Sequence, residues 1–207
     1  MKTLKGTTKY FQLTFSIVLM AGVISLTSCS EDDPMKEDVP ELITKATLTF
    51  TPVGGGTPIT VSATDPDGEG VQDIQVDGAI NLAANTTYAL TLGLINELAE
   101  TSSPEYNIAD EVEEEGDEHM FFYSWTGDVF SDPAGNGNID NRADAVNYED
   151  EDDNGFPLGL TTTWTTAANG SGTFRVVLKH QPDLKSATSD ANTGETDLDI
   201  EFEVNLN

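Results

Sequence analysis

The sequence predicts an all-β domain, an antiparallel immunoglobulin-like β-sandwich with one short helix and long acidic loops. Short runs rich in β-branched and aromatic residues alternate apolar with polar positions, and Gly, Asn, Asp or Pro separates them roughly every ten residues. Helical periodicity is nearly absent, which leaves no room for the crossover helices of a parallel sheet. A closed β-barrel is the alternative architecture.

The expected strands follow one another with little between them except turns. The first alternates Ala46, Leu48 and Phe50 with threonines, and three glycines turn it into the second. The third is weak and breaks at 77–78, and an Asn-Gly pair at 169–170 is typical of a hairpin turn. In order, the strands are expected at residues 43–53, 59–64, 71–80, 86–96, 119–125, 145–148, 160–166, 172–180 and 198–206.

One short helix is expected at residues 107–115. Asn107 can cap it, Ile108 and Val112 share one face, and Gly116 ends it. Acidic residues occupy its last turn, where the helix dipole disfavours negative charge. The pattern therefore predicts a cation near this end of the helix.

The N-terminus is typical of an exported protein. Residues 1–28 combine three lysines with an apolar run too short to span a bilayer comfortably, which indicates a signal peptide. Leu-Thr-Ser before Cys29, the only cysteine, resembles a bacterial lipobox, which implies that Cys29 carries the lipid anchor. Residues 29–41 are polar and are expected to be a disordered tether, and residues 42–207 the sandwich domain.

Charge limits the partners of the mature chain. Loss of the signal leaves six basic residues against 37 acidic ones, a net charge of about −31. Such a chain repels phosphate backbones, so a nucleic-acid partner is excluded, and it attracts cations. The acids directly after Cys29 resemble the signal that sends Bacteroidota lipoproteins to the cell surface, which favours an outer-membrane protein facing the exterior.

Acidic loops are the first candidate cation sites. Two of them place oxygen side chains at positions one, three and five with glycine at position six, a spacing that suits calcium. Neither has the glutamate at position twelve that an EF-hand needs, and the same residues are common in ordinary turns. The candidate calcium ligands are Asp65, Asp67 and Glu69 in one loop and Asp150, Asp152 and Asn154 in the other.

The only two histidines are the second candidate site. His119 opens one expected strand and His180 closes another, each in phase with core residues. If every connection reverses direction, both lie at one edge of the sandwich, provided that residues 145–148 form a strand. Two imidazoles with carboxylates suit zinc or a similar divalent ion, although a lone rim histidine is often structural. The expected oxygen ligands are Glu115, Asp117, Glu118 and Asp183.

Catalytic signals are weak, and we expect a protein that is not an enzyme. After lipidation no cysteine nucleophile remains, and the sequence has no G-x-S-x-G, H-E-x-x-H or phosphate-loop motif. Aromatic residues such as Trp125 and Trp164 would form a sugar-binding platform if exposed, but at strand spacing they are more often core.

Four segments carry a resemblance to a known group: Glu-Glu-Gly-Asp-Glu-His at 114–119 followed by Phe121-Phe122, Asp-Asp-Asn-Gly-x-Pro-Leu-Gly-Leu-Thr-Thr-Thr-Trp-Thr-Thr at 152–166, Leu-Lys-His-Gln-Pro-Asp-Leu-Lys-Ser at 178–186, and Gly-Glu-Thr-Asp at 194–197. Over most of residues 44–207 the chain resembles small acidic Bacteroidota surface lipoproteins, often labelled type 1 periplasmic binding fold lipoproteins. That label implies an α/β fold, whereas the strand pattern favours the β-sandwich. The resemblance also implies a TonB-dependent outer-membrane receptor as partner.

Two functions are therefore expected. The first is a non-enzymatic surface lipoprotein that binds a divalent metal ion and delivers it to an outer-membrane receptor. The second is an adhesion or carbohydrate-binding module whose acidic loops hold structural calcium. Binding of zinc, and its dependence on the two histidines, separates them.

Overall fold

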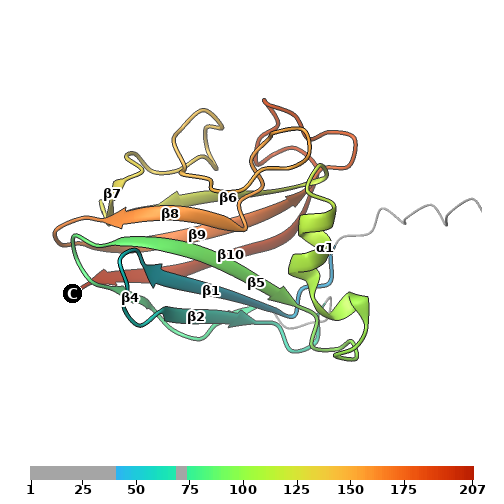
Figure 1. Cartoon of the computed structure of the whole chain (residues 1–207), viewed down its shortest axis with the longest axis horizontal. Helices are drawn as coiled ribbons and strands as arrows, with labels where there is room; N and C mark the ends of the chain where they lie inside the picture. The colour runs from blue at the N-terminus through green and yellow to red at the C-terminus, as the bar shows by residue number, and fades with distance from the viewer. Residues whose placement is uncertain (1–40, 69–73) are drawn as a thin grey trace, which may run out of the picture. The chain divides into compact units, whose positions relative to one another are not determined.

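The computed structural model of this chain describes residues 41–68 and 74–207, which all fall in one unit, Asp38–Asn207. Figure 1 shows its strands as two layers with long loops at one side. Several predictions lie outside the described residues: the signal peptide at 1–28, Cys29 with the tether up to residue 40, Glu69, and the first residues of the strand expected at 71–80.

Two sheets make up the unit. The six-stranded sheet has the order β3-β2-β1-β5-β8-β7 and the four-stranded sheet the order β4-β10-β9-β6. The first contains β1 (Lys45–Pro52), β2 (Ile59–Thr64), β3 (Gln75–Val76), β5 (Thr87–Ile95), β7 (Phe130–Asp132) and β8 (Thr161–Thr166), and the second β4 (Ile80–Leu82), β6 (His119–Trp125), β9 (Ser171–His180) and β10 (Glu195–Leu206).

The predicted all-β, two-sheet architecture is confirmed. Neighbouring strands are antiparallel except β4 and β10, which run parallel with Ile80 opposite Val204. The weak strand expected at 71–80 is broken as predicted, and its two described parts belong to different sheets, β3 beside β2 and β4 beside β10.

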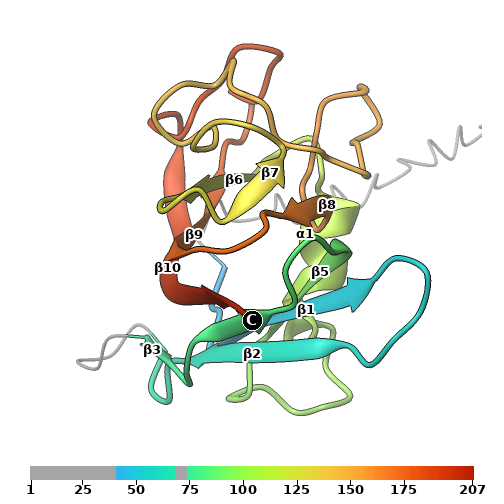
Figure 2. The ribbon, with the colours of Figure 1, turned by 90° about the vertical axis from the view of Figure 1, so that its left-hand side faces the viewer.

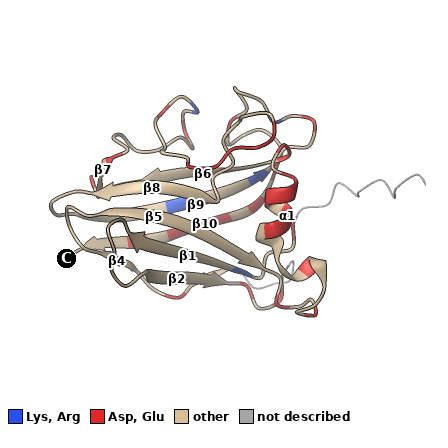
Figure 3. Ribbon diagram, in the orientation of Figure 1, with Lys and Arg blue, Asp and Glu red and all other residues tan. Residues whose placement is uncertain are grey.

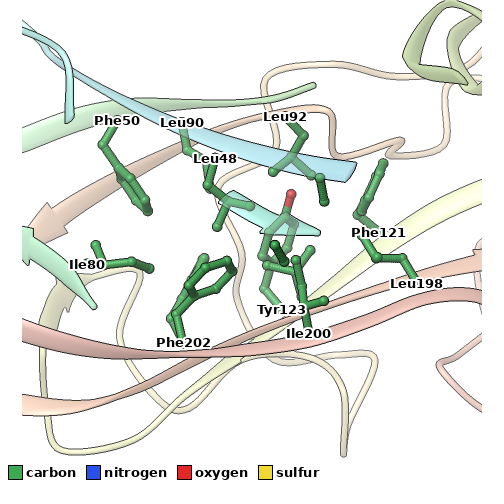
Figure 4. Packing of buried hydrophobic residues seen from close by; sticks show 14 of the residues in the cluster. Leu48, Phe50, Ile80, Leu90, Leu92, Phe121, Tyr123, Leu198, Ile200 and Phe202 are labelled. Atoms are coloured by element: carbon green, nitrogen blue, oxygen red, sulfur yellow. The ribbon is translucent and has the colours of Figure 1, made fainter. Parts of the chain in front are cut away.

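The core lies between the sheets. Leu48 and Phe50 from β1 face Phe202 from β10 across it (Figure 4). Trp125 and Trp164 are 2% and 0% exposed and meet edge to face, with ring centroids 5.2 Å apart. The aromatic residues therefore stabilise the core, and they do not form an exposed platform for sugars.

The region between β6 and β8 differs from the prediction. Residues 145–148, all of them described, form no strand, and Tyr148 alone makes an isolated bridge, to Thr162. The short strand β7, which the sequence analysis missed, pairs with β8 instead. Because β7 supplies the reversal expected from 145–148, the end of β9 still lies beside the start of β6.

A side chain, and not a strand ladder, ties the segment before β8 to β6. The Tyr148 hydroxyl donates a hydrogen bond of 2.6 Å to the Phe121 carbonyl and accepts one of 2.8 Å from the Asn138 amide. These bonds satisfy the tyrosine tip, while its ring packs on the core. The apolar residues that suggested a strand are thus used in a loop.

Two short helical segments connect β5 to β6. The 3-10 helix η1 (Pro104–Tyr106) precedes α1 (Ile108–Glu114), which lies at the end of the sandwich where β5 ends and β6 begins (Figure 1). Ile108 and Val112 are buried as predicted, but the Asn107 side chain makes no capping bond. No helix within the described residues is long and apolar enough to cross a membrane.

Loops cover the outer face of β6 and β9. Met120, Phe122 and Val177 form a second buried cluster there, separate from the main core. The loops that follow β6 and β9 lie above β6 in both Figure 1 and Figure 2. Since both faces of this pair of strands are buried, residues at its end are shielded from water.

Candidate metal centre

The two histidines lie side by side. His119 is the first residue of β6, His180 is the last of β9, and the antiparallel register pairs them directly. Their rings stack with centroids 4.7 Å apart and planes 4° apart, and they are 0% and 5% exposed. The predicted meeting of the two imidazoles is therefore found in the structure.

A hydrogen bond fixes the tautomer of His119. Its Nδ1 lies 3.1 Å from the backbone carbonyl oxygen of Glu115, at the end of α1. Because a carbonyl only accepts, Nδ1 carries the proton, and Nε2 of the neutral ring keeps its lone pair. Metal-binding histidines commonly donate their other ring N–H in this way, which orients the ring.

Asp197 completes the group, and the sequence analysis did not name it as a ligand. Ligand atoms of His119, His180 and Asp197 all lie within 4.8 Å of one another. The register of β9 and β10 shifts at 196–198, so Asp197 is the extra residue of a β-bulge. The bulge turns it away from the outward direction of Asp199, and its side chain is fully buried.

The Asp197 carboxylate is in an electrostatically unfavourable place. Burial raises its pKa to about 6, although the positive charge of His180 acts in the opposite direction. Its Oδ2 lies 3.8 Å from His119 Nε2, and the Glu41 backbone N–H and the charge of Lys179 also oppose the shift, without cancelling it. A buried carboxylate normally has a cation or several donors, so this group fits a metal ligand.

Two glutamates flank the imidazoles. Glu118 Oε2 lies 3.5 Å from His180 Nε2, but Glu118 does not belong to the converging group of His119, His180 and Asp197. Glu41 Oε1 lies 3.7 Å from His119 Nε2, with its side chain 9% exposed. Glu41 was expected at the end of the disordered tether, yet it contacts the site.

The remaining predicted ligands lie elsewhere. The backbone carbonyl of Glu115 accepts the hydrogen bond from His119. The Glu115 carboxylate lies near those of Glu41 and Glu111. Asp117 is exposed, in the turn between α1 and β6, and Asp183 is exposed in the turn after β9 with a φ of 58°. Within the described residues, neither belongs to a converging group of three metal-binding side chains.

The first acidic loop is an ordinary turn in its described part. Asp65 Oδ1 accepts hydrogen bonds from the backbone N–H groups of Asp67 and Gly68, at 3.3 and 3.1 Å. Such side-chain to backbone bonds are the reason that aspartate is common at turns. Glu69, the third predicted ligand of this loop, lies outside the described residues.

The second acidic loop is held by protein groups. Asp150 accepts hydrogen bonds from the backbone N–H groups of Gly159 and Thr161, at 2.7 and 2.8 Å. Burial raises the pKa of Asp150, and these two bonds oppose that shift. Asn154, the third predicted calcium ligand, is exposed.

Lys185 provides the cation for Asp152. Its Nζ lies 2.9 Å from Asp152 Oδ2 and donates a 2.6 Å hydrogen bond to the Gly116 carbonyl. Asp152 Oδ1 accepts from the N–H groups of Asn154 and Phe156, both at 2.9 Å. The spacing that suggested calcium thus builds a turn and a buried ion pair, so this structure gives no reason to place calcium there.

The histidine group has the composition of a transition-metal site. Two imidazole nitrogens with one or two carboxylate oxygens suit zinc or another borderline divalent ion better than calcium. Tetrahedral zinc needs neighbouring ligand atoms about 3.3 Å apart, close to the 3.7 and 3.8 Å from Glu41 and Asp197 to His119 Nε2.

Comparisons with known proteins give no family to which the chain can be assigned. No family model, no curated protein and no solved structure matches it.

Proposed function

We propose that the chain is a non-enzymatic, lipid-anchored surface protein that binds a divalent metal ion, with zinc as the best fit. His119 and His180 would supply the nitrogen ligands and Asp197 an oxygen ligand, with Glu118 beside His180. The predicted lipid on Cys29 would hold the domain at the outer membrane, facing the exterior. A TonB-dependent receptor is the proposed acceptor of the ion.

One observation carries this proposal: two buried imidazoles converge on the Asp197 carboxylate, whose side chain is fully buried and whose pKa rises to about 6 although His180, the Glu41 backbone N–H and Lys179 favour its charged form. Burial of a charge without full compensation is costly, whereas a divalent ion would neutralise Asp197 and use the His119 Nε2 lone pair. The excess of acidic residues would raise the local cation concentration.

The adhesion or carbohydrate-binding alternative has no comparable support. The tryptophans that would stack on a sugar are in the core, and the loop aspartates that would hold calcium bind backbone N–H groups or Lys185. We therefore carry only the metal-binding proposal forward.

Zinc titration of the purified full chain tests the proposal. The wild type and a His119→Ala, His180→Ala double variant are titrated with zinc chloride against a competing chelator. Changes around a metal ligand commonly cost about 10- to 100-fold in affinity, so loss of two ligands should cost about 100-fold or more. Equal affinity in both proteins would refute the proposal.

A second variant guards against a folding artefact. His180→Gln keeps most of the side-chain volume at the less buried histidine, and thermal unfolding in chelator shows whether it folds like the wild type. The fold control is Glu203→Gln, an exposed carboxylate on β10. We expect His180→Gln, but not Glu203→Gln, to lose zinc affinity.

A further inference from the structure

A buried metal site needs a route for the ion, and one residue links this site to the surface. Glu41 Oε1 lies 3.7 Å from His119 Nε2, and the Glu41 carboxylate also lies within 4.8 Å of those of Glu111 and Glu115 on and beside α1. Within the described residues, Glu41 thus borders both groups of converging metal-binding side chains. We call Glu41, Glu111 and Glu115 the carboxylate trio.

Exposure increases from the histidines toward the trio. The side chains of His119 and Asp197 are 0% exposed and that of His180 is 6%, whereas Glu41 is 9% exposed. Glu111 and Glu115 are half-buried and line an open surface hollow of about 280 Å³. An ion in this hollow would meet Glu111 and Glu115, whose carboxylates lie within 4.8 Å of that of Glu41.

The hollow is also strongly negative. Acidic residues gather along α1 and the adjoining turns (Figure 3), and the last turn of α1 has no basic residue. Glu111 belongs to the first turn of α1, where the helix dipole favours an acid, and Glu115 follows its last turn. The charge therefore attracts hydrated divalent ions to the solvent side of Glu41.

A cluster of acids alone would not define a site, but the histidine group adds an independent observation. The Asp197 side chain is fully buried, and its Oδ2 lies 3.8 Å from His119 Nε2. Burial raises its pKa even though His180, the Glu41 backbone N–H and Lys179 favour the charged form. A divalent ion would favour that charged form further, and Glu41 lies beside the same His119 nitrogen.

We propose that Glu41 is a fourth, exchangeable ligand of the ion bound by His119, His180 and Asp197, and that it transfers the ion to them from Glu111 and Glu115. The inference rests on the proposed function.

The test measures zinc binding by the full chain at equilibrium and in stopped-flow mixing with a fluorescent chelator. Glu41→Gln removes one charged ligand with little change in volume, and Glu111→Gln with Glu115→Gln removes the outer carboxylates. The matched control is Glu97→Gln with Glu113→Gln, which removes two exposed charges, one of them on α1.

We expect Glu41→Gln to weaken zinc binding about tenfold or more and to speed release. The Glu111, Glu115 variant should slow uptake several-fold while release stays unchanged, and the control should match the wild type. Unchanged affinity and release in Glu41→Gln, with zinc still lost in the histidine variant, would overturn this inference alone. If the histidine double variant bound zinc as tightly as the wild type, the proposed function would be overturned instead.

Discussion

Two buried aspartates in the same domain have pKa values shifted in opposite directions. The side chains of Asp152 and Asp197 are both fully buried. Burial raises the pKa of Asp152, but the Phe156 N–H and the Lys185 ammonium outweigh it, so that pKa ends below its usual value. Burial raises the pKa of Asp197 to about 6, because the charges of His180 and Lys179 and the Glu41 backbone N–H only partly offset the loss of water.

The difference separates a structural carboxylate from a candidate functional one. Asp152 has a permanent cation and two backbone donors, so it contributes to the fold and has no ligand to gain. Asp197 is destabilising as a charged group in the isolated chain, and it becomes favourable when a cation arrives. A binding role for Asp197, as proposed above, would account for this cost in stability.

Removing the permanent cation should have the largest effect. Lys185→Met leaves the Asp152 carboxylate buried without its counter-ion, which typically costs about 3–5 kcal/mol. Denaturant unfolding in chelator would measure the loss. Adding Asp152→Asn should recover part of it, whereas a loss below about 1 kcal/mol would contradict the assignment of Asp152 as a buried, cation-dependent group.

Removing the unfavourable charge of Asp197 should increase the stability of the fold. Asp197→Asn should stabilise the chelator-treated protein at pH 8, because a shift from 3.8 to about 6 corresponds to about 3 kcal/mol. The same variant should lose zinc affinity. A single change that raises stability and abolishes binding would be the signature of a functional carboxylate.

The pH dependence has a definite sign. Because the folded pKa of Asp197 is raised, its contribution to stability is fully present below about pH 4 and is lost as the pH rises through about 6. The stability difference between variant and wild type should therefore grow from near zero at pH 4 toward about 3 kcal/mol at pH 8. A constant difference would mean that Asp197 does not titrate in this range.

Zinc should offset most of this difference for the wild type. At a free concentration about 100 times the dissociation constant, a ligand that binds only the folded state adds about 2.7 kcal/mol. Melting temperatures of the wild type and Asp197→Asn, measured with zinc and with chelator, would check this. We expect the wild type to gain and the variant to stay unchanged.

The sequence predicted the strands well where alternation alone decides the structure. The runs at 43–53 and 86–96 match β1 and β5 within about two residues, because each buries alternate side chains in one core. The run at 119–125 matches β6, which is buried on both faces. The prediction of a strand at 145–148 was wrong. In this loop, the Tyr148 hydroxyl bonds to the Phe121 carbonyl of β6. The three-residue β7 was too short to give a pattern.

Only part of the candidate site could be predicted from the sequence, for a similar reason. His119 and His180 are in phase with core residues, so their meeting followed from strand direction. Asp197 would point outward like Asp199 under simple alternation, and only the bulge turns it inward. Glu41 looked like part of the tether, because no local pattern reveals a contact with a distant strand.

The smallest effect is expected for Asp199, two residues after Asp197 on the same strand. Its carboxylate binds Arg175 in a two-pronged pair at 2.7 and 2.6 Å, but the two side chains are 44% and 39% exposed. Exposed pairs contribute about 0–1 kcal/mol and are screened by salt, so Asp199→Asn should change stability by less than about 1 kcal/mol. Zinc affinity should stay at the wild-type value. If Asp199→Asn lowered zinc affinity as much as Asp197→Asn, the general negative charge of β10, and not the carboxylate turned inward by the bulge, would be the source of binding.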